Sequence, residues 1–138
     1  MAEKKNIKKK LTEQQQQDLD VSIGFLEGIV RRDPGYVEAL QLLGDDYTRR
    51  GKYESGLQVD ERLTQLRPGD PLVQYNLACS YSLTAQFDKA AAALDRALDL
   101  GYRDFKWLSR DPDLKAFRAH ALYKAILGKV RKLKIKVD

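Results

Sequence analysis

The sequence predicts an all-α protein built from antiparallel helix pairs, and three observations lead to this prediction. A unit of 34 residues occurs twice in succession, and the two copies together make up about half of the chain. Apolar residues recur at spacings of three and four, which is the period of an α-helix. Breaks that contain Gly and Pro fall between the periodic segments, at 33–35 and 67–71.

The repeated stretch carries a recognisable pattern. It reads L-x2-L-G-x2-Y from Leu40 and Q-x2-L-A-x2-Y from Gln74, and the same step takes Pro34 to Pro68. These residues resemble the tetratricopeptide repeat, whose pattern is W-x2-L-G-x2-Y, then A-x3-F, then P. The resemblance implies a right-handed α-solenoid of stacked helix pairs, a tetratricopeptide-like superhelix closed by a C-terminal helical cap.

Length and composition restrict the class of protein. A chain of 138 residues, 43% apolar and 33% charged, is long enough for one core and suits a soluble helical protein. No apolar run approaches the length of a membrane span, and we expect no secretory signal. With one cysteine there is no intramolecular disulfide, which favours a reducing compartment, and we predict a cytoplasmic protein.

The net charge of +5 is concentrated at the two ends. Five lysines lie in the first ten residues, and six basic residues lie between Lys124 and the C-terminus. The segment between them, 11–123, holds 14 basic and 18 acidic residues. The repeats are therefore mildly acidic, and the basic balance of the chain belongs to its ends.

The domain organisation follows from these segments. Residues 1–11 are predicted to be a basic, disordered arm, and residues 12–138 a single domain. The predicted domain has five parts: a half repeat (12–34), repeat one (37–70), repeat two (71–104), capping helices (105–134) and a tail (135–138).

The half repeat is predicted to be one helix, the second of a pair whose first helix is missing. Thr12 and a glutamine three residues later have the spacing of a capping box. Residues 19–30 supply one apolar face, which Phe25 is expected to widen. Gly24 and Gly28, four residues apart, predict a close crossing with another helix.

Repeat one is predicted to contain helices at about 36–50 and 53–66. Gly51 lies between them and has the usual C-terminal role. Gly44 is expected to allow the partner helix to approach closely. Asp60 stands where the family has a large aromatic residue, so we expect it to be exposed or paired.

Repeat two and the segment after it have clear start and stop signals. Asp70 is expected to cap a helix that begins with proline, and Gly101 to end the second helix of the pair. Beyond it we predict two short helices, at about 111–118 and 119–134, that cover the last repeat. The predicted covering residues are Trp107, Phe117, Leu122 and Ile126.

An enzyme is not predicted. The chain has no Gly-rich phosphate loop or nucleophile elbow, and its single cysteine and single histidine, Cys79 and His120, are far apart. Asp111 and Asp113 are explained by their place at a helix start. We therefore predict no catalytic residue, no cofactor and no metal site.

The candidate site is a peptide-binding groove, because the resemblance implies that the first helix of each pair lines a concave face. The predicted groove residues are Gln41, Asp45, Arg49, Leu72, Tyr75, Asn76, Cys79, Lys106 and Arg110. An alternative for Tyr75 is that it packs on the N-terminal helix or on the cap.

One form of such a groove in this family is a clamp of Lys, Asn, Asn, Lys and Arg that binds a C-terminal carboxylate. In the 34-residue register, Asn76, Lys106 and Arg110 match its last three residues. Gln41 and Asp45 stand at the first two, and Asp45 would repel a carboxylate. A working clamp is therefore not the favoured interpretation.

The favoured function is a non-enzymatic protein-interaction module, or adaptor, that binds a peptide segment of a partner in its groove. Two alternatives from other classes stay open. The lysine-rich ends predict a binder of nucleic acid or of acidic surfaces, with a steep salt dependence. Exposed end faces of the array predict a self-associating structural unit.

Overall fold

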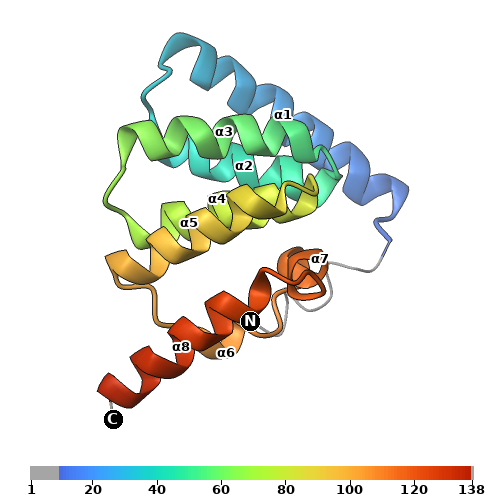
Figure 1. Ribbon diagram of the computed structural model, residues 1–138. Coiled ribbons are helices and arrows are strands. Elements are labelled where there is room, and N and C mark those ends of the chain that lie inside the picture. Colours follow the sequence, from blue (N-terminus) through green and yellow to red (C-terminus); the bar gives the residue numbers. More distant parts are fainter. Residues whose placement is uncertain (1–9, 138) are drawn as a thin grey trace. The chain divides into compact units, whose positions relative to one another are not determined.

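The computed structural model describes residues 10–137, with side chains to 135, and this part of the chain is helical without a strand (Figure 1). The helices are α1 (Glu13–Arg32), α2 (Val37–Arg50), α3 (Tyr53–Leu66), α4 (Pro71–Leu83), α5 (Phe87–Leu100), α6 (Phe105–Leu108), the 3-10 helix η2 (Pro112–Leu114), α7 (Lys115–Arg118) and α8 (Tyr123–Val137). The all-α class is thus confirmed. The predicted basic arm lies almost wholly outside the described residues.

The chain divides into two compact units, residues 1–68 and 69–138. The boundary falls in the Pro- and Gly-containing break between repeat one and repeat two. Unit 1 holds α1, α2 and α3, and unit 2 holds the remaining helices. Each unit is described by itself below.

In unit 1, α2 packs against both α1 and α3. The apolar face of α1 is buried at Leu19, Ile23 and Leu26, and α2 buries Leu40 and Leu43 among others. These positions follow the spacings of three and four in the sequence, because residues so spaced lie on one side of a helix. The apolar face predicted within residues 19–30 is therefore confirmed at Leu19, Ile23 and Leu26.

The close approach of α3 to α2 depends on glycine. A Cβ atom on Gly44 of α2 would lie 3.3 Å from Cγ1 of Val59, which is tighter than ordinary van der Waals contact. A Cβ atom on Gly56 of α3 would lie at the same distance, 3.3 Å, from the hydroxyl oxygen of Thr48. Asp60 was expected to be either exposed or paired. Its side chain is buried, at 8% exposure, so it is not an exposed residue.

The predicted capping residues Thr12, Gly51, Asp70 and Gly101 are confirmed. Thr12 and Gln15 form a reciprocal capping box, with backbone-to-side-chain hydrogen bonds of 3.1 and 2.9 Å. Gly51 and Gly101 have φ of +85° and +114°, where a residue with a Cβ atom is strained. The carboxylate of Asp70 accepts the first backbone N–H groups of α4.

Two predictions about α1 are wrong within unit 1. Phe25 does not widen the buried face, because its side chain is 70% exposed. Gly24 is exposed, and a Cβ atom there would meet no heavy atom of the described residues within 4 Å. Gly28 meets only the end of the Arg31 side chain, so neither glycine marks a close crossing of helices here.

Unit 2 is built on the α4–α5 pair. η2 and α7 pack on α4, and α8 packs on α5. Trp107, Phe117 and Ile126 are buried as predicted, whereas Leu122 is half-buried. The last helix begins at Tyr123 and not at 119, because residues 119–122 form turns in which His120 accepts hydrogen bonds at both Nδ1 and its carbonyl.

Candidate functional site: two exposed helix faces and an apolar cleft

The outward face of α2 carries the predicted groove residues of repeat one. Gln41, Asp45 and Arg49 are all exposed, on the side of α2 opposite the buried leucines. Sequence reasoning missed Leu42, which belongs to the same side of the helix and is 57% exposed. The sequence could have indicated this exposure, because Leu42 does not belong to the series of apolar residues, spaced by three and four, that forms the buried face of α2.

In unit 2 the predicted groove residues separate into two groups. Leu72 is 55% exposed, Lys106 and Arg110 are exposed, and Asn76 is half-buried. Tyr75 and Cys79 are buried, at 2% and 6% exposure. The structure therefore does not support a ligand-lining role for these two side chains.

Tyr75 is buried because the capping segment covers it. Its ring stacks on Tyr102, with centroids 4.2 Å apart and planes 5° apart. Its hydroxyl donates a 2.7 Å hydrogen bond to Oδ2 of Asp111, which is fully buried. Burial, and then the neighbouring Cys79 and Asp111, raise the pKa of Tyr75 far above its usual range. Packing on the cap, the alternative interpretation of Tyr75, is what the structure shows.

Asp111 caps η2 with one carboxylate oxygen and connects the cap to α4 with the other. Oδ1 accepts the backbone N–H of Asp113 at 3.0 Å, which is the predicted capping role. Oδ2 accepts the hydroxyl of Tyr75 and, at 3.7 Å, the thiol of Cys79. Arg118 donates to the Asp111 carbonyl at 2.8 Å and thereby holds the start of η2 to the end of α7.

Cys79, Asp111 and Asp113 also bring metal-ligating atom types within 4.8 Å of one another. All three residues are buried, and the oxygens of Asp111 already accept the hydrogen bonds described above. This cluster is explained by capping and by attachment of the cap to α4.

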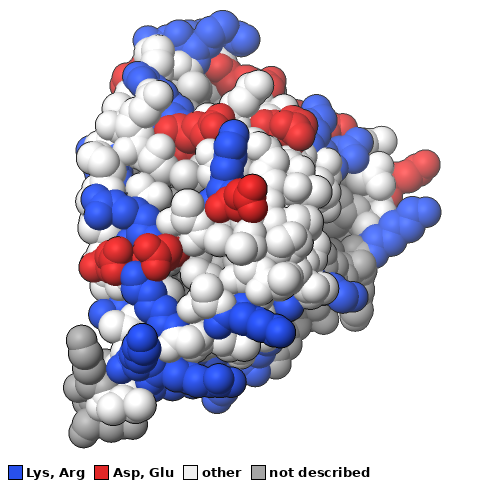
Figure 2. Space-filling model, in the orientation of Figure 1, with Lys and Arg blue, Asp and Glu red and all other residues white. Residues whose placement is uncertain are grey.

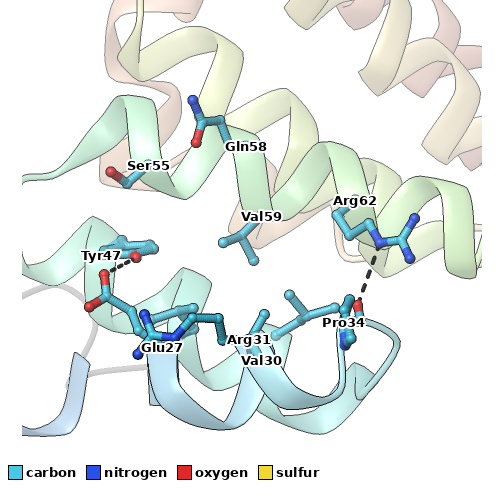
Figure 3. Close-up of a pocket in the computed structure, with 11 residues that line it drawn as sticks. Glu27, Val30, Arg31, Pro34, Tyr47, Ser55, Gln58, Val59 and Arg62 are labelled. Atoms are coloured by element: carbon cyan, nitrogen blue, oxygen red, sulfur yellow. Dashed lines mark hydrogen bonds between the residues drawn. The ribbon is translucent and has the colours of Figure 1, made fainter. Parts of the chain in front are cut away.

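Unit 1 contains an apolar cleft of about 360 Å³ between α1 and α3, with α2 beneath it (Figure 3). Its lining residues are Glu27, Val30, Arg31, Pro34, Leu40, Leu43, Tyr47, Ser55, Gln58, Val59 and Arg62. The apolar members come from the buried faces of the helices, whereas polar and charged side chains form the rim. A cleft of this size accommodates one or two side chains of a partner.

The rim of the cleft is held by polar contacts. The Tyr47 hydroxyl donates a short hydrogen bond to Glu27, and Arg62 reaches the carbonyl of Pro34 at 3.5 Å (Figure 3). Burial, and then the hydrogen bond to Glu27, raise the pKa of Tyr47 to about 12. The cleft was not predicted from the sequence, because it exists only where α1 and α3 fail to meet over α2.

The fold defines a class: a tetratricopeptide-like helical protein. No family model matches the chain. Over 88% of its length the chain superposes on 68% of the MamA RS-1 ArsTM double mutant with a TM-score of 0.62, at 20% identity. This likeness supports a tetratricopeptide-like helical solenoid as the fold class.

Two relatives are similar in sequence. A protein of Arabidopsis thaliana whose name describes it as chloroplastic is 37% identical over 78 residues, which cover 54% of this chain and 23% of that protein. The PEX5-related protein of Mus musculus is 29% identical over 98 residues, which cover 71% of this chain and 16% of that protein. These similarities suggest a tetratricopeptide-type family at modest identity.

The chain spans less than a quarter of the length of each of these relatives. Because one of them is described as chloroplastic, the cytoplasmic location predicted here stays a prediction. Among the described helices, none is long and apolar enough to cross a membrane.

Proposed function

We propose that the chain is a non-enzymatic, cytoplasmic adaptor module that holds a peptide segment of another protein against the outward face of α2. The predicted residues Gln41, Asp45 and Arg49 form the polar part of this face. In unit 2 the predicted groove residues whose side chains reach the surface are Leu72, Asn76, Lys106 and Arg110, and we propose them as a separate contact surface of that unit.

The observation that carries the proposal is the exposure of Leu42 among these polar residues. Leu42 is 57% exposed, although the neighbouring Leu43 is 3% exposed and part of the core. Helical spacing sets Leu42 beside Glu38, Asp45 and Arg49 on one side of α2. An apolar side chain surrounded by charged ones is the usual composition of a small interaction surface.

This arrangement favours a partner segment with one apolar residue and charges of both signs. Burial of the partner's apolar side chain against Leu42 supplies the hydrophobic gain. Asp45 and Arg49, one helical turn apart, then select the order of the partner's charges, because a reversed order sets like charges together. The cleft of unit 1 offers a second position for an apolar side chain.

The test is selection from a random peptide library displayed on phage, followed by direct binding of the selected peptides. We expect the intact chain to select peptides that Leu42→Glu fails to bind, because the substitution removes the apolar contact and adds a negative charge. Ala92→Glu is the matched control, since Ala92 is exposed on α5 in unit 2. Peptides retained equally by the Leu42 and Ala92 variants would overturn the assignment to α2.

A second variant distinguishes the two surfaces of unit 1. Gln58→Trp places a large ring at the rim of the cleft and leaves the outward face of α2 unchanged. Loss of peptide binding in this variant, with binding intact in Leu42→Glu, would assign the peptide to the cleft.

The nucleic-acid alternative makes a different prediction, which is tested by RNA binding to the same variants. Contacts between lysines and phosphates weaken steeply with added salt, whereas a contact centred on Leu42 does not. Single-stranded RNA bound at low salt by both the intact chain and Leu42→Glu would favour the lysine-rich ends as the functional surface.

A further inference from the structure

Unit 2 contains a groove between α6 and α8, and Lys106 is the one residue of the proposed function among the residues that line it. Its volume is about 540 Å³. Its apolar lining includes Phe105 and Leu108 from α6 and Leu127 and Val130 from α8. Phe105 and Leu127 are half-buried, so apolar surface is open to a ligand.

The rim of this groove is mainly basic. Arg103, Lys106 and Lys134 line it, all three exposed, and Nζ of Lys134 lies 5.9 Å from the centre of the Phe105 ring. Lys and Arg side chains gather over α6 and α8 in Figure 2. The one acid in the lining, Asp104, accepts the backbone N–H of Trp107 at 3.1 Å and so caps α6. The groove therefore suits an apolar segment with acidic flanks.

The exposed side of α1 in unit 1 has this composition. Val21 and Phe25, one turn apart, are 73% and 70% exposed. Residues 13–30 hold four acidic residues and no basic residue. Asp18 adjoins the Val21–Phe25 pair by helical spacing. Gly24, between the two apolar residues, has open space around it, so a second surface can approach the helix closely there.

We propose that the chain self-associates head to tail, with α1 of one copy seated in the α6–α8 groove of a second copy. Val21 and Phe25 enter the apolar groove, and Asp18 lies near the basic rim. The partner surfaces are different, so the contact is heterologous, and a pair of copies keeps one free groove and one free α1 surface. Further copies can add to these free surfaces as the concentration rises.

Charge complementarity selects a second copy as the occupant. Asp18, the acid of α1 that adjoins the apolar pair, would lie against a groove whose rim carries three cations and one acid. Asp20 is already bound by Arg50 at 2.9 Å and is therefore not counted among the acids that contact the rim. Attraction of this kind weakens with salt, whereas burial of Phe25 does not.

The first test is sedimentation velocity of the full chain from low to high micromolar concentration. We expect the average mass to rise with concentration, and to rise less at high salt. Phe25→Ser is expected to raise the apparent Kd of association about tenfold or more, because a Phe side chain loses its burial. Tyr36→Ser is a matched control, since Tyr36 is also an exposed aromatic of unit 1. A strict monomer over the whole range overturns the proposal.

The second test uses two variants that each lack one surface. Phe25→Ser removes the α1 surface. The double variant Arg131→Glu with Lys134→Glu reverses two positive charges of α8, one at the rim residue Lys134 and one at Arg131, an exposed residue three positions before it. Each variant alone is expected to be largely monomeric. An equal mixture retains one intact surface of each kind and is expected to form a 1:1 complex. A mixture that stays monomeric, or a double variant that associates like the intact chain, overturns the proposal.

The outcome is separable from the proposed peptide-binding function. Leu42→Glu lies outside both surfaces and is expected to self-associate like the intact chain. Circular dichroism of each variant establishes that it is folded before its mass is interpreted. Association that persists in Phe25→Ser and is lost in Leu42→Glu would assign self-association to α2 and contradict the head-to-tail arrangement.

Discussion

Replacement of Tyr75 by phenylalanine is the sharpest test of how the cap is held to the repeat. The substitution removes one oxygen atom and leaves the ring, so stacking on Tyr102 is retained. The lost interaction is the 2.7 Å hydrogen bond to the buried carboxylate of Asp111. A hydrogen bond to a charged group contributes roughly 1.5–3 kcal/mol. We therefore expect the free energy of unfolding of unit 2 to fall by about 2 kcal/mol.

The assay is urea denaturation followed by tryptophan fluorescence. Trp107 is the single tryptophan of the chain, is 4% exposed and lies in unit 2, so its emission reports this unit. The control is Tyr123→Phe, since Tyr123 is a half-buried tyrosine of the same unit, with an expected change within about 0.5 kcal/mol. A loss for Tyr75→Phe no larger than for this control would refute the reasoning.

Asp111→Ala extends the test to the other side of the same hydrogen bond. It removes the acceptor of the Tyr75 hydroxyl and of the Asp113 backbone N–H together. A lost helix cap costs about 1 kcal/mol, and a buried donor left without a partner about 1–3 kcal/mol. We expect Asp111→Ala to destabilise unit 2 more than Tyr75→Phe does, in the same urea assay.

Three further outcomes follow from the structure. Tyr75 and Tyr102 have raised pKa values because they are buried, so above pH ~10 the unfolded chain ionises first and stability should fall by up to about 1.4 kcal/mol per pH unit for each, as measured by urea denaturation between pH ~9 and ~11. Gly44→Val should lower the stability of unit 1 by about 1–3 kcal/mol, since Val59 leaves no room, and thermal unfolding followed by circular dichroism checks this. Lys129→Ala should cost no more than about 1 kcal/mol in the same assay, although the ammonium group is within 2.7 Å of two aspartates, because the pair is partly exposed.

The candidate site was predictable only in part. The spacing of Gln41, Asp45 and Arg49 places them opposite the buried face of α2, and the sequence of this one helix is enough to predict that they are exposed. The same reasoning failed for Tyr75, because its surroundings come from the cap, 36 residues away in the sequence. The exposure of Phe25 was missed for a similar reason: an apolar residue beside an apolar stripe is buried only if a neighbouring helix reaches it.

The sequence by itself determined the repeat and the helices of the repeats with their capping residues, because a helix and its cap depend on residues within one or two turns. A 34-residue period, a capping box at Thr12 and glycines at 51 and 101 specify local backbone structure, and local structure is readable from local residues. Only the tertiary structure decided which side chains reach the surface. Whether Tyr75 is buried or Phe25 is exposed depends on segments that are distant in the sequence. Protein interiors are close-packed, so a side chain is buried only where another segment packs against it.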